Sequence, residues 1–143
     1  MIENLTIIVP YRNDPAGLMR LLRTLPAGLP VIVVDDMSDD FPDGEWGKRT
    51  VLIHLRERGY FSGAVNAGIQ AAGTTDVLVL NQDLWFTDVR LFDVIAGNRR
   101  QYALIGDGVF GHPAWPCGYI QGTAMFLRRD AIEIGRASCR ERV

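Results

Sequence analysis

Carboxylates follow two short apolar runs of this sequence, and each group has a chemistry of its own. Asp35 and Asp36 come directly after Val31–Val34, where carboxylate oxygens could accept hydrogen bonds from a ligand's ring N–H or hydroxyl groups. Asp83 follows Val77–Leu80, and an oxygen ligand there suits Mg²⁺ or Mn²⁺, which combine carboxylates with phosphate oxygens and water. Asp and Ser are also common turn residues, so a purely structural role stays open at this point.

A glycine-containing segment, Gly59–Gly68, supplies a second kind of candidate. Gly63 and Asn66 lie in the first turns of a predicted helix. The N-terminal end of a helix attracts phosphate through its dipole and its free N–H groups. Glycine in this place permits close approach by a ligand, although it serves helix packing equally well.

The other reactive residue types form no pattern that indicates chemistry. His54 and His112 have no Cys or His close by in the sequence, and we predict surface or turn positions for both. Cys117 and Cys139 lack metal-ligand spacing, which favours a reducing cytoplasm. Aromatic side chains that could stack on a sugar or a base, but that occur more often in cores, are Trp85, Phe86, Trp115 and Tyr119.

The elements that must position these residues can be read from the apolar pattern. Continuous apolar runs are typical of buried parallel strands, and apolar residues three or four apart between capping residues are typical of helices. The predicted strands are Leu5–Val9, Val31–Val34, Thr50–His54, Val77–Leu80 and Gly122–Leu127. The predicted helices are Pro15–Leu25 with Asp14 as N-cap, a helix from the N-cap Ser62 to Gly73 at C′, and Val89–Arg99. Gly106–Gly118 is predicted to be an irregular loop.

Alternation of strands and helices predicts an α/β fold, a mostly parallel sheet with right-handed crossovers and flanking helices. Ligands of such sheets bind outside the carboxyl ends of the strands. Asp35, Asp36 and Asp83 all fall at those ends. We therefore expect one binding site at this edge of the sheet.

Composition limits the classes of function. At 143 residues and 48% hydrophobic, the chain is expected to form one domain or part of one. A net charge of −2, with 15 basic residues spread along the chain, gives no reason to expect nucleic-acid binding. No apolar run is long enough to span a bilayer. We expect a cytoplasmic protein, whose attachment to the inner face of the cell membrane, if any, would be peripheral.

The end of the chain is unusual. Glu133–Val143 can be written in codons that match read-through into a common sequencing adapter. We therefore predict a non-native tail over 133–143, with a basic amphipathic helix end as the alternative. The domain at 1–132 would then be C-terminally truncated, and Cys139 carries no redox inference.

Four motifs of this sequence resemble motifs of glycosyltransferase family 2 and occur in the same order as in that family. They are Ile7–Asn13, Val33–Asp40, Asn66–Gly68 and Leu80–Asp83. Gly122–Asp130 is similar to the family's strand before the acceptor-side helix, so the resemblance covers about Leu5 to Ile132. Asn81-Gln82-Asp83 is most similar to the rhamnosyl- and galactofuranosyl-transferase-like branch. The resemblance implies the GT-A fold, a Rossmann-like sheet of nucleotide-diphospho-sugar transferases.

The resemblance also implies roles for individual residues. Pro10 and Tyr11 would line the pocket for the nucleobase. Asp36 would accept a hydrogen bond from the nucleobase, and Asp35 would support the same site. The implied nucleotide-sugar-binding residues are Pro10, Tyr11, Asp35, Asp36, Arg58, Gly63, Asn66 and Gln82, and the implied ligand of Mn²⁺ or Mg²⁺ is Asp83. Asn81 stands where many members have Asp, so metal ligation would rest chiefly on Asp83. The family's catalytic base should follow Asp130, where the tail stands, so no residue present is assigned as base.

The activity implied is that of an inverting hexosyltransferase. It would move a sugar from a nucleotide-diphosphate sugar to a hydroxyl of a glycan or lipid-linked acceptor, in bacterial cell-wall or polysaccharide biosynthesis, and this fragment alone would be inactive. One alternative is a non-catalytic nucleotide-binding module, such as a receiver-like domain. Such a domain would be expected to have acidic residues where Pro10 and Tyr11 stand. A nucleotidyltransferase would carry a Gly-rich basic loop where Tyr11–Asp14 stands, and a dehydrogenase would carry Gly-x-Gly-x-x-Gly there.

Overall fold

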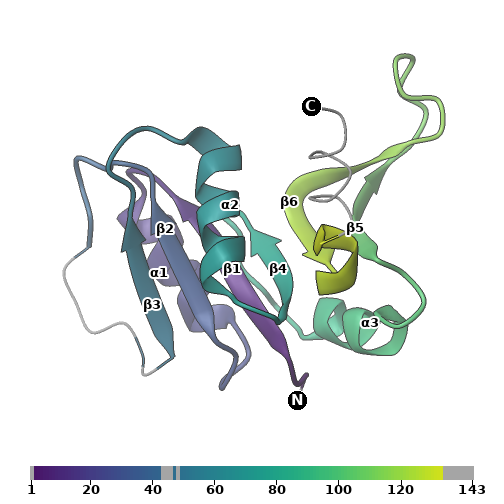
Figure 1. The fold of residues 1–143 in the computed structure, drawn as a ribbon, viewed down its shortest axis with the longest axis horizontal. Helices are drawn as coiled ribbons and strands as arrows, with labels where there is room; N and C mark the ends of the chain where they lie inside the picture. The colour runs from purple at the N-terminus through teal and green to yellow at the C-terminus, as the bar shows by residue number, and fades with distance from the viewer. Residues whose placement is uncertain (1, 43–46, 48, 134–143) are drawn as a thin grey trace.

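A six-stranded sheet forms the centre of the computed structural model, which describes residues 2–42, 47 and 49–133 (Figure 1). The strands are β1 (Leu5–Tyr11), β2 (Val31–Asp35), β3 (Thr50–His54), β4 (Asp76–Leu80), β5 (Leu104–Val109) and β6 (Tyr119–Leu127). The helices are α1 (Pro15–Thr24), α2 (Tyr60–Ala71) and α3 (Arg90–Asn98). The predicted strands and helices are therefore all present, with one further strand, β5.

The order of strands across the sheet is β3-β2-β1-β4-β6-β5. Pairing is parallel from β3 to β4 and antiparallel at β4–β6 and β6–β5. The sheet is therefore mostly parallel, as predicted. Tyr11 is in register with Asp35, and Asp35 with His54, so the carboxyl ends of three neighbouring strands lie at one level.

Helices cover both faces of the sheet because its central strands are apolar on both sides. On one face, Leu18 and Leu21 of α1 and Ile95 of α3 pack with Ile7 and Val9. On the other, α2 packs against β1, β2 and β4 (Figure 1). Each buried aliphatic side chain contributes roughly 1.5–3 kcal/mol, so the parallel strands form a rigid base for the loops at their ends.

Caps confirm one predicted helix start and correct another. The Asp14 carboxylate accepts a hydrogen bond from the Gly17 N–H at 3.0 Å, as expected of the N-cap of α1. The prediction of Ser62 as N-cap of α2 is wrong, because Gly59 precedes the first helical residue. The Gly59 N–H donates to the Asp36 carboxylate at 2.7 Å, and this distant contact helps to fix where the helix begins. Gly73, with φ of 69°, has the left-handed conformation expected at C′.

The predicted loop at Gly106–Gly118 is wrong over its first part. β5 pairs with β6 as far as Val109 opposite Tyr119, with an irregularity in register between Gly106 and Gly108. Glycine disfavours strands by itself, but pairing with a neighbouring strand overrides that preference. Gly106 fits because an added Cβ would lie 2.5 Å from the carbonyl oxygen of Ala124. The result is a hairpin that projects past the end of β4 (Figure 1).

Two sequence expectations concern the chain as a whole. Among the described residues, no helix is long and apolar enough to cross a membrane. The predicted tail begins at Glu133, and its residues 134–143 lie outside the described residues.

Candidate functional site

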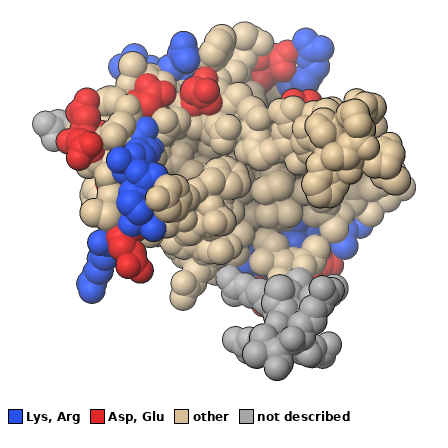
Figure 2. Space-filling model, turned by 90° about the horizontal axis from the view of Figure 1, so that it is seen from above, with Lys and Arg blue, Asp and Glu red and all other residues tan. Residues whose placement is uncertain are grey.

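A cavity of about 210 Å³ opens at the carboxyl edge of the sheet. It is lined by Pro10, Tyr11, Arg12, Asp36, Arg58, Tyr60, Phe61, Ala64 and Gln82. Five of these were predicted from sequence, and they come from four separate parts of the chain. Seen from this edge, acidic and basic side chains lie side by side over one part of the surface, while the face of the lobe at the right of the view is coloured tan (Figure 2).

Asp36 is the most constrained acid of the cavity, with the residue only 5% exposed. One carboxylate oxygen accepts from the Gly59 N–H, and the other pairs with Nε of Arg58 at 3.1 Å. The Arg58 guanidinium in turn lies over the Tyr60 ring, 4.6 Å from its centroid. Each carboxylate oxygen can accept more than one hydrogen bond, so Asp36 is held in place and still able to accept from a ligand.

Asp35 is equally buried but is not among the residues that line the cavity. Its carboxylate accepts from the Ser38 N–H at 3.0 Å and lies 2.8 Å from Nδ1 of His54. Asp35 therefore holds the loop that follows Asp36. We predicted His54 as a surface or turn residue, and its side chain is 59% exposed, but the sequence did not reveal this pairing. The register that places His54 beside Asp35 is the only feature that could have suggested it.

Tyr11 is buried and is among the residues that line the cavity. The phenol donates to the carbonyl of Asp40 at 3.0 Å, and the ring meets Phe41 edge to face with centroids 5.2 Å apart. Burial raises the pKa of the Tyr11 phenol above its usual value, and the nearby charges of Asp40 and Asp35 act in the same direction. The hydroxyl thus anchors the loop after β2.

Arg12 connects the ends of three strands, and no role was predicted for it from the sequence. Its backbone N–H donates to Oε1 of Gln82 at 2.6 Å, and Nε2 of Gln82 donates to the Arg12 carbonyl at 2.9 Å. Its guanidinium donates to the carbonyls of Asp36 and Met37, both at 2.8 Å. The position of Arg12 inside the motif around Tyr11 was the available sequence indication.

Besides Asp35, three further predicted residues lie apart from the cavity lining. Asp83 is exposed, its carbonyl accepts from Arg20 at 3.5 Å, and among the described residues its carboxylate has no hydrogen-bond partner. Asn66 is exposed on α2. Gly63 lies in the first turn of α2, with open space where a Cβ would stand. Asp83 and Gly63 are therefore accessible to a ligand that extends beyond the cavity.

The aromatic candidates are not among the cavity-lining residues, whereas Tyr60 and Phe61 are. Trp85 is exposed beneath the Arg20 guanidinium, 4.2 Å from its ring centroid, and Phe86 packs against Phe92. Trp115 and Tyr119 contact each other in the β5–β6 hairpin.

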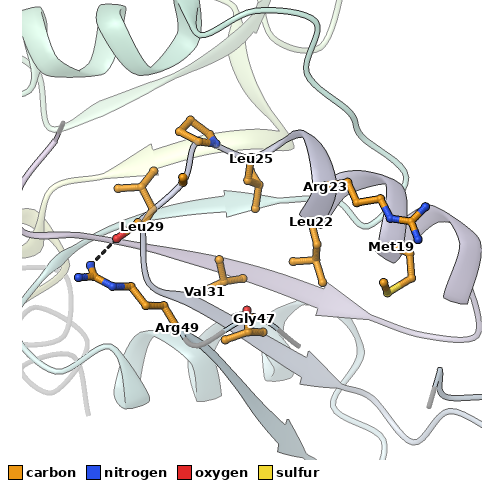
Figure 3. A pocket seen from close by; sticks show the side chains of 12 residues that line it. Met19, Leu22, Arg23, Leu25, Leu29, Val31, Gly47 and Arg49 are labelled. Carbon is orange, nitrogen blue, oxygen red and sulfur yellow. Dashed lines mark hydrogen bonds between the residues drawn. The ribbon is translucent and has the colours of Figure 1, made fainter. Parts of the chain in front are cut away.

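A second cavity, of about 490 Å³, lies at the opposite edge of the sheet (Figure 3). It is bounded by the end of α1 and the starts of β2 and β3, with aliphatic side chains such as Leu22 and Leu29. Arg49 reaches across it to the carbonyl of Gly28. Its described lining contains no carboxylate, in contrast to the site at the carboxyl edge.

The sequence model of Glycosyl transferase family 2 matches residues 6–114, which is most of the chain. The chain belongs to glycosyltransferase family 2. The match includes all the residues of the cavity and Asp83. It ends before β6.

Curated relatives of this family 2 chain are longer proteins. The pre-mycofactocin glycosyltransferase of Mycobacterium tuberculosis (strain CDC 1551 / Oshkosh) is 39% identical over 88 residues, which cover 57% of this chain and 18% of the relative. An uncharacterised glycosyltransferase of Mycobacterium bovis (strain ATCC BAA-935 / AF2122/97) is 30% identical over 81 residues, which cover 57% of this chain and 37% of the relative. The chain therefore matches less than half of each relative's length.

Solved structures show that this family 2 chain has the GT-A fold. A mannosyltransferase from Pyrobaculum calidifontis, solved with GDP-Man and Mn²⁺, superposes with a TM-score of 0.71 at 18% identity, covering 91% of this chain and 46% of that one. Residues 1–349 of S. aureus TarS superpose with a TM-score of 0.58 at 18% identity, covering 87% and 47%.

Asp83 is the residue predicted to bind a metal ion in the family 2 site. Among the described residues, no group of three or more His, Cys, Asp or Glu side chains is close enough together to hold an ion. Mg²⁺ is commonly held by one or two carboxylates together with substrate phosphates and water. The Asp83 carboxylate, which is exposed and has no hydrogen-bond partner in the described part of the chain, fits that kind of site.

Proposed function

We propose that this chain is the donor-binding part of an inverting hexosyltransferase. The enzyme would move a sugar from a nucleotide-diphosphate sugar to a hydroxyl of a glycan or lipid-linked acceptor, in bacterial cell-wall or polysaccharide synthesis. The observation that carries the proposal is Asp36, a buried carboxylate held by Arg58 and the Gly59 N–H in a cavity at the carboxyl edge of a family 2 sheet.

The nucleoside end of the donor would occupy the cavity. Pro10 and Tyr11 supply an apolar wall, and Asp36 would accept from a ring N–H or a ribose hydroxyl. Arg58 borders the same space, and Asp35 supports it by holding Ser38. A cavity of this size takes the nucleoside alone, so the diphosphate and the sugar would extend over the surface towards Asp83 and the first turns of α2, where Gly63 and Asn66 lie.

Mn²⁺ or Mg²⁺ would be held by Asp83 together with diphosphate oxygens of the donor. When bound, the ion would supply charge stabilisation to the departing diphosphate. The acceptor oxygen would form its bond to the anomeric carbon as the bond to the diphosphate breaks, with the electron pair leaving on the diphosphate oxygen. A carboxylate would take the acceptor's proton. We assign this last role to no residue of the chain.

The test is a calorimetric titration of residues 1–143 with UDP, GDP and dTDP, each with and without Mn²⁺. Asp36→Asn keeps an acceptor for the Gly59 N–H but removes the charge, and we expect it to weaken nucleotide binding at least about tenfold, in line with loss of a charged hydrogen bond. Asp83→Ala should abolish only the increase in affinity due to Mn²⁺. Asp39→Ala, an exposed acid of the same loop, is the matched control.

Two results would contradict the proposal. One is wild-type protein that binds none of the three nucleotides. The other is an increase in affinity with Mn²⁺ that survives in Asp83→Ala, which would remove the metal assignment.

A further inference from the structure

Gln82 and Arg12 form a clasp between the two loops that the proposed donor would touch. We propose that this clasp, defined as the paired hydrogen bonds between the Gln82 amide and the Arg12 backbone, couples the metal side of the site to the nucleotide side. Gln82 and Arg12 are then positioning residues. This inference rests on the proposed donor and metal sites.

The clasp continues the sheet beyond the end of its ladder. β1 and β4 are in register from Leu5 opposite Asp76 to Ile8 opposite Val79. Beyond that point, Pro10 has no N–H to donate. The Gln82 amide then both accepts from the Arg12 N–H and donates to the Arg12 carbonyl, as a backbone peptide of a neighbouring strand would. A side chain thus fixes the separation of the two strand ends.

The Gln82 amide has both of its polar ends engaged in this contact. Its oxygen lies 2.6 Å from the Arg12 nitrogen, and its nitrogen lies 2.9 Å from the Arg12 oxygen. Gln82 lines the cavity, and the family resemblance implied direct donor contact. The geometry points instead to a residue that holds protein to protein.

The other end of the connection is the Arg12 side chain. Its guanidinium donates to the carbonyls of Asp36 and Met37. Met37 has φ of 58°, a conformation that non-glycine residues adopt only when their surroundings hold them there. The neighbouring Asn13 adds to the hold, because its Oδ1 accepts from the N–H groups of Asp39 and Asp40 at 2.8 and 3.2 Å. The orientation of the Asp36 peptide therefore depends on Arg12.

These contacts form one continuous path from Asp83 to Asp36. Asp83 is bonded to Gln82, Gln82 holds the Arg12 backbone, and the Arg12 side chain holds the carbonyl of Asp36. A nucleoside diphosphate with its metal would touch both ends of this path. Once the ligand contacts one end, the affinity gained from contact with the other end depends on the effective concentration there. That concentration is highest when the distance between the two ends is fixed. An intact clasp therefore increases the effect of the metal on nucleotide affinity. By linkage, it increases the effect of the nucleotide on metal affinity by the same factor.

The test compares the affinity for UDP, GDP and dTDP with and without Mn²⁺ in the wild type and in Gln82→Met. The substitution keeps the length of the side chain and removes both hydrogen bonds without adding charge. We expect the increase in affinity due to Mn²⁺ to fall at least about fivefold, within the usual range of coupling between sites. Metal-free nucleotide affinity should change much less. Gln70→Met, at an exposed position of α2, is the matched control.

Arg12→Met breaks the same path at its other end and serves as the test if Gln82→Met does not fold. Arg12 also lines the cavity, so each variant is compared with itself, with and without Mn²⁺. The double variant should lose no more of the metal effect than either single variant, because both interrupt one path. Thermal unfolding of every variant without ligand separates a loss of coupling between the two sites from a general loss of stability.

The outcomes separate the two proposals. Wild-type protein that binds no nucleotide would overturn the proposed function and this inference with it. A wild type that responds to Mn²⁺, together with a Gln82→Met variant that keeps the full response, would overturn the clasp alone. The clasp would also be overturned if Gln82→Met lowered nucleotide affinity equally with and without Mn²⁺. It would likewise be overturned if the double variant lost the sum of the Mn²⁺ effects lost by the two single variants.

Discussion

Single residues at the carboxyl edge have their polar atoms committed to neighbouring loops, and Tyr11 is a clear case. Its ring is buried while its hydroxyl donates to Asp40, so the side chain ties β1 to the loop after β2. The same burial raises the pKa of the phenol. A group that the folded state holds protonated links stability to pH in the alkaline range.

Tyr11→Phe should separate these two contributions. Loss of the hydrogen bond to Asp40 should lower the free energy of unfolding by about 1 kcal/mol at pH 7. Because the folded-state pKa is raised, the wild type has its full phenol contribution below the unfolded pKa of about 10 and loses it as pH rises through the folded value. Urea unfolding from pH 7 to 11 should therefore show a steeper alkaline decline in wild type than in Tyr11→Phe. Tyr102→Phe, at an exposed position, is the control at pH 7, and equal alkaline slopes would contradict the prediction.

Among the elements, α2 joins the site to the core, and two of its glycines have different reasons to be there. A Cβ at Gly68 would lie 2.4 Å from Cγ2 of Ile8, whereas a Cβ at Gly63 would meet nothing within 4 Å. Packing therefore requires glycine at one position only. At Gly63, glycine lowers the stability of the helix by its usual amount without relieving any packing contact.

The matched pair Gly68→Ala and Gly63→Ala tests this difference on one helix. We expect Gly68→Ala to destabilise the protein by about 1–3 kcal/mol, because α2 must move away from β1. Gly63→Ala should stabilise it by about 0.5–1 kcal/mol. Urea unfolding at 25 °C measures both. If Gly63→Ala stabilises the fold but weakens nucleotide binding, the glycine serves the ligand, and if it destabilises the fold, the packing argument is wrong.

Elements that depend on local sequence were predictable, and those that depend on distant partners were not. β1, β2 and β4 are apolar runs that specify burial by themselves, and Asp14 caps the helix beside it. The start of α2 was misplaced because its position depends on the Asp36 side chain, far away in sequence. The first part of the predicted loop became β5 because β6 pairs with it.

The same division holds at the candidate site. The family resemblance implied that Asp36 and Arg58 both border the nucleotide, and the structure brings these two side chains together. The partners of Arg12 and His54 depend on which strands are neighbours and in what register, which the spacing of residues along the chain does not give.

At the scale of the whole molecule, Asp76 connects the parallel half of the sheet to its antiparallel edge. One carboxylate oxygen accepts from the Arg99 guanidinium at the end of α3, and the other accepts from the Arg129 N–H after β6 at 2.8 Å. Arg99 also donates to the carbonyls of Glu3 and Asn4 before β1. This buried carboxylate therefore joins four separate segments at the edge of the sheet opposite the site.

Asp76→Ala should be the most damaging substitution considered, although it lies far from the proposed donor. Removing one partner of a buried ion pair leaves the other charge uncompensated, which typically costs about 3–5 kcal/mol. Because Asp76 is only 7% exposed, the loss should persist in 1 M NaCl. Guanidinium unfolding at 25 °C measures it. The control is Asp88→Ala, which removes an exposed ion pair with Arg90 and a hydrogen bond from the Arg90 N–H, and which should cost much less stability than Asp76→Ala. Equal stabilities of Asp76→Ala and wild type would mean that the two halves of the sheet are held together by strand pairing and apolar packing alone.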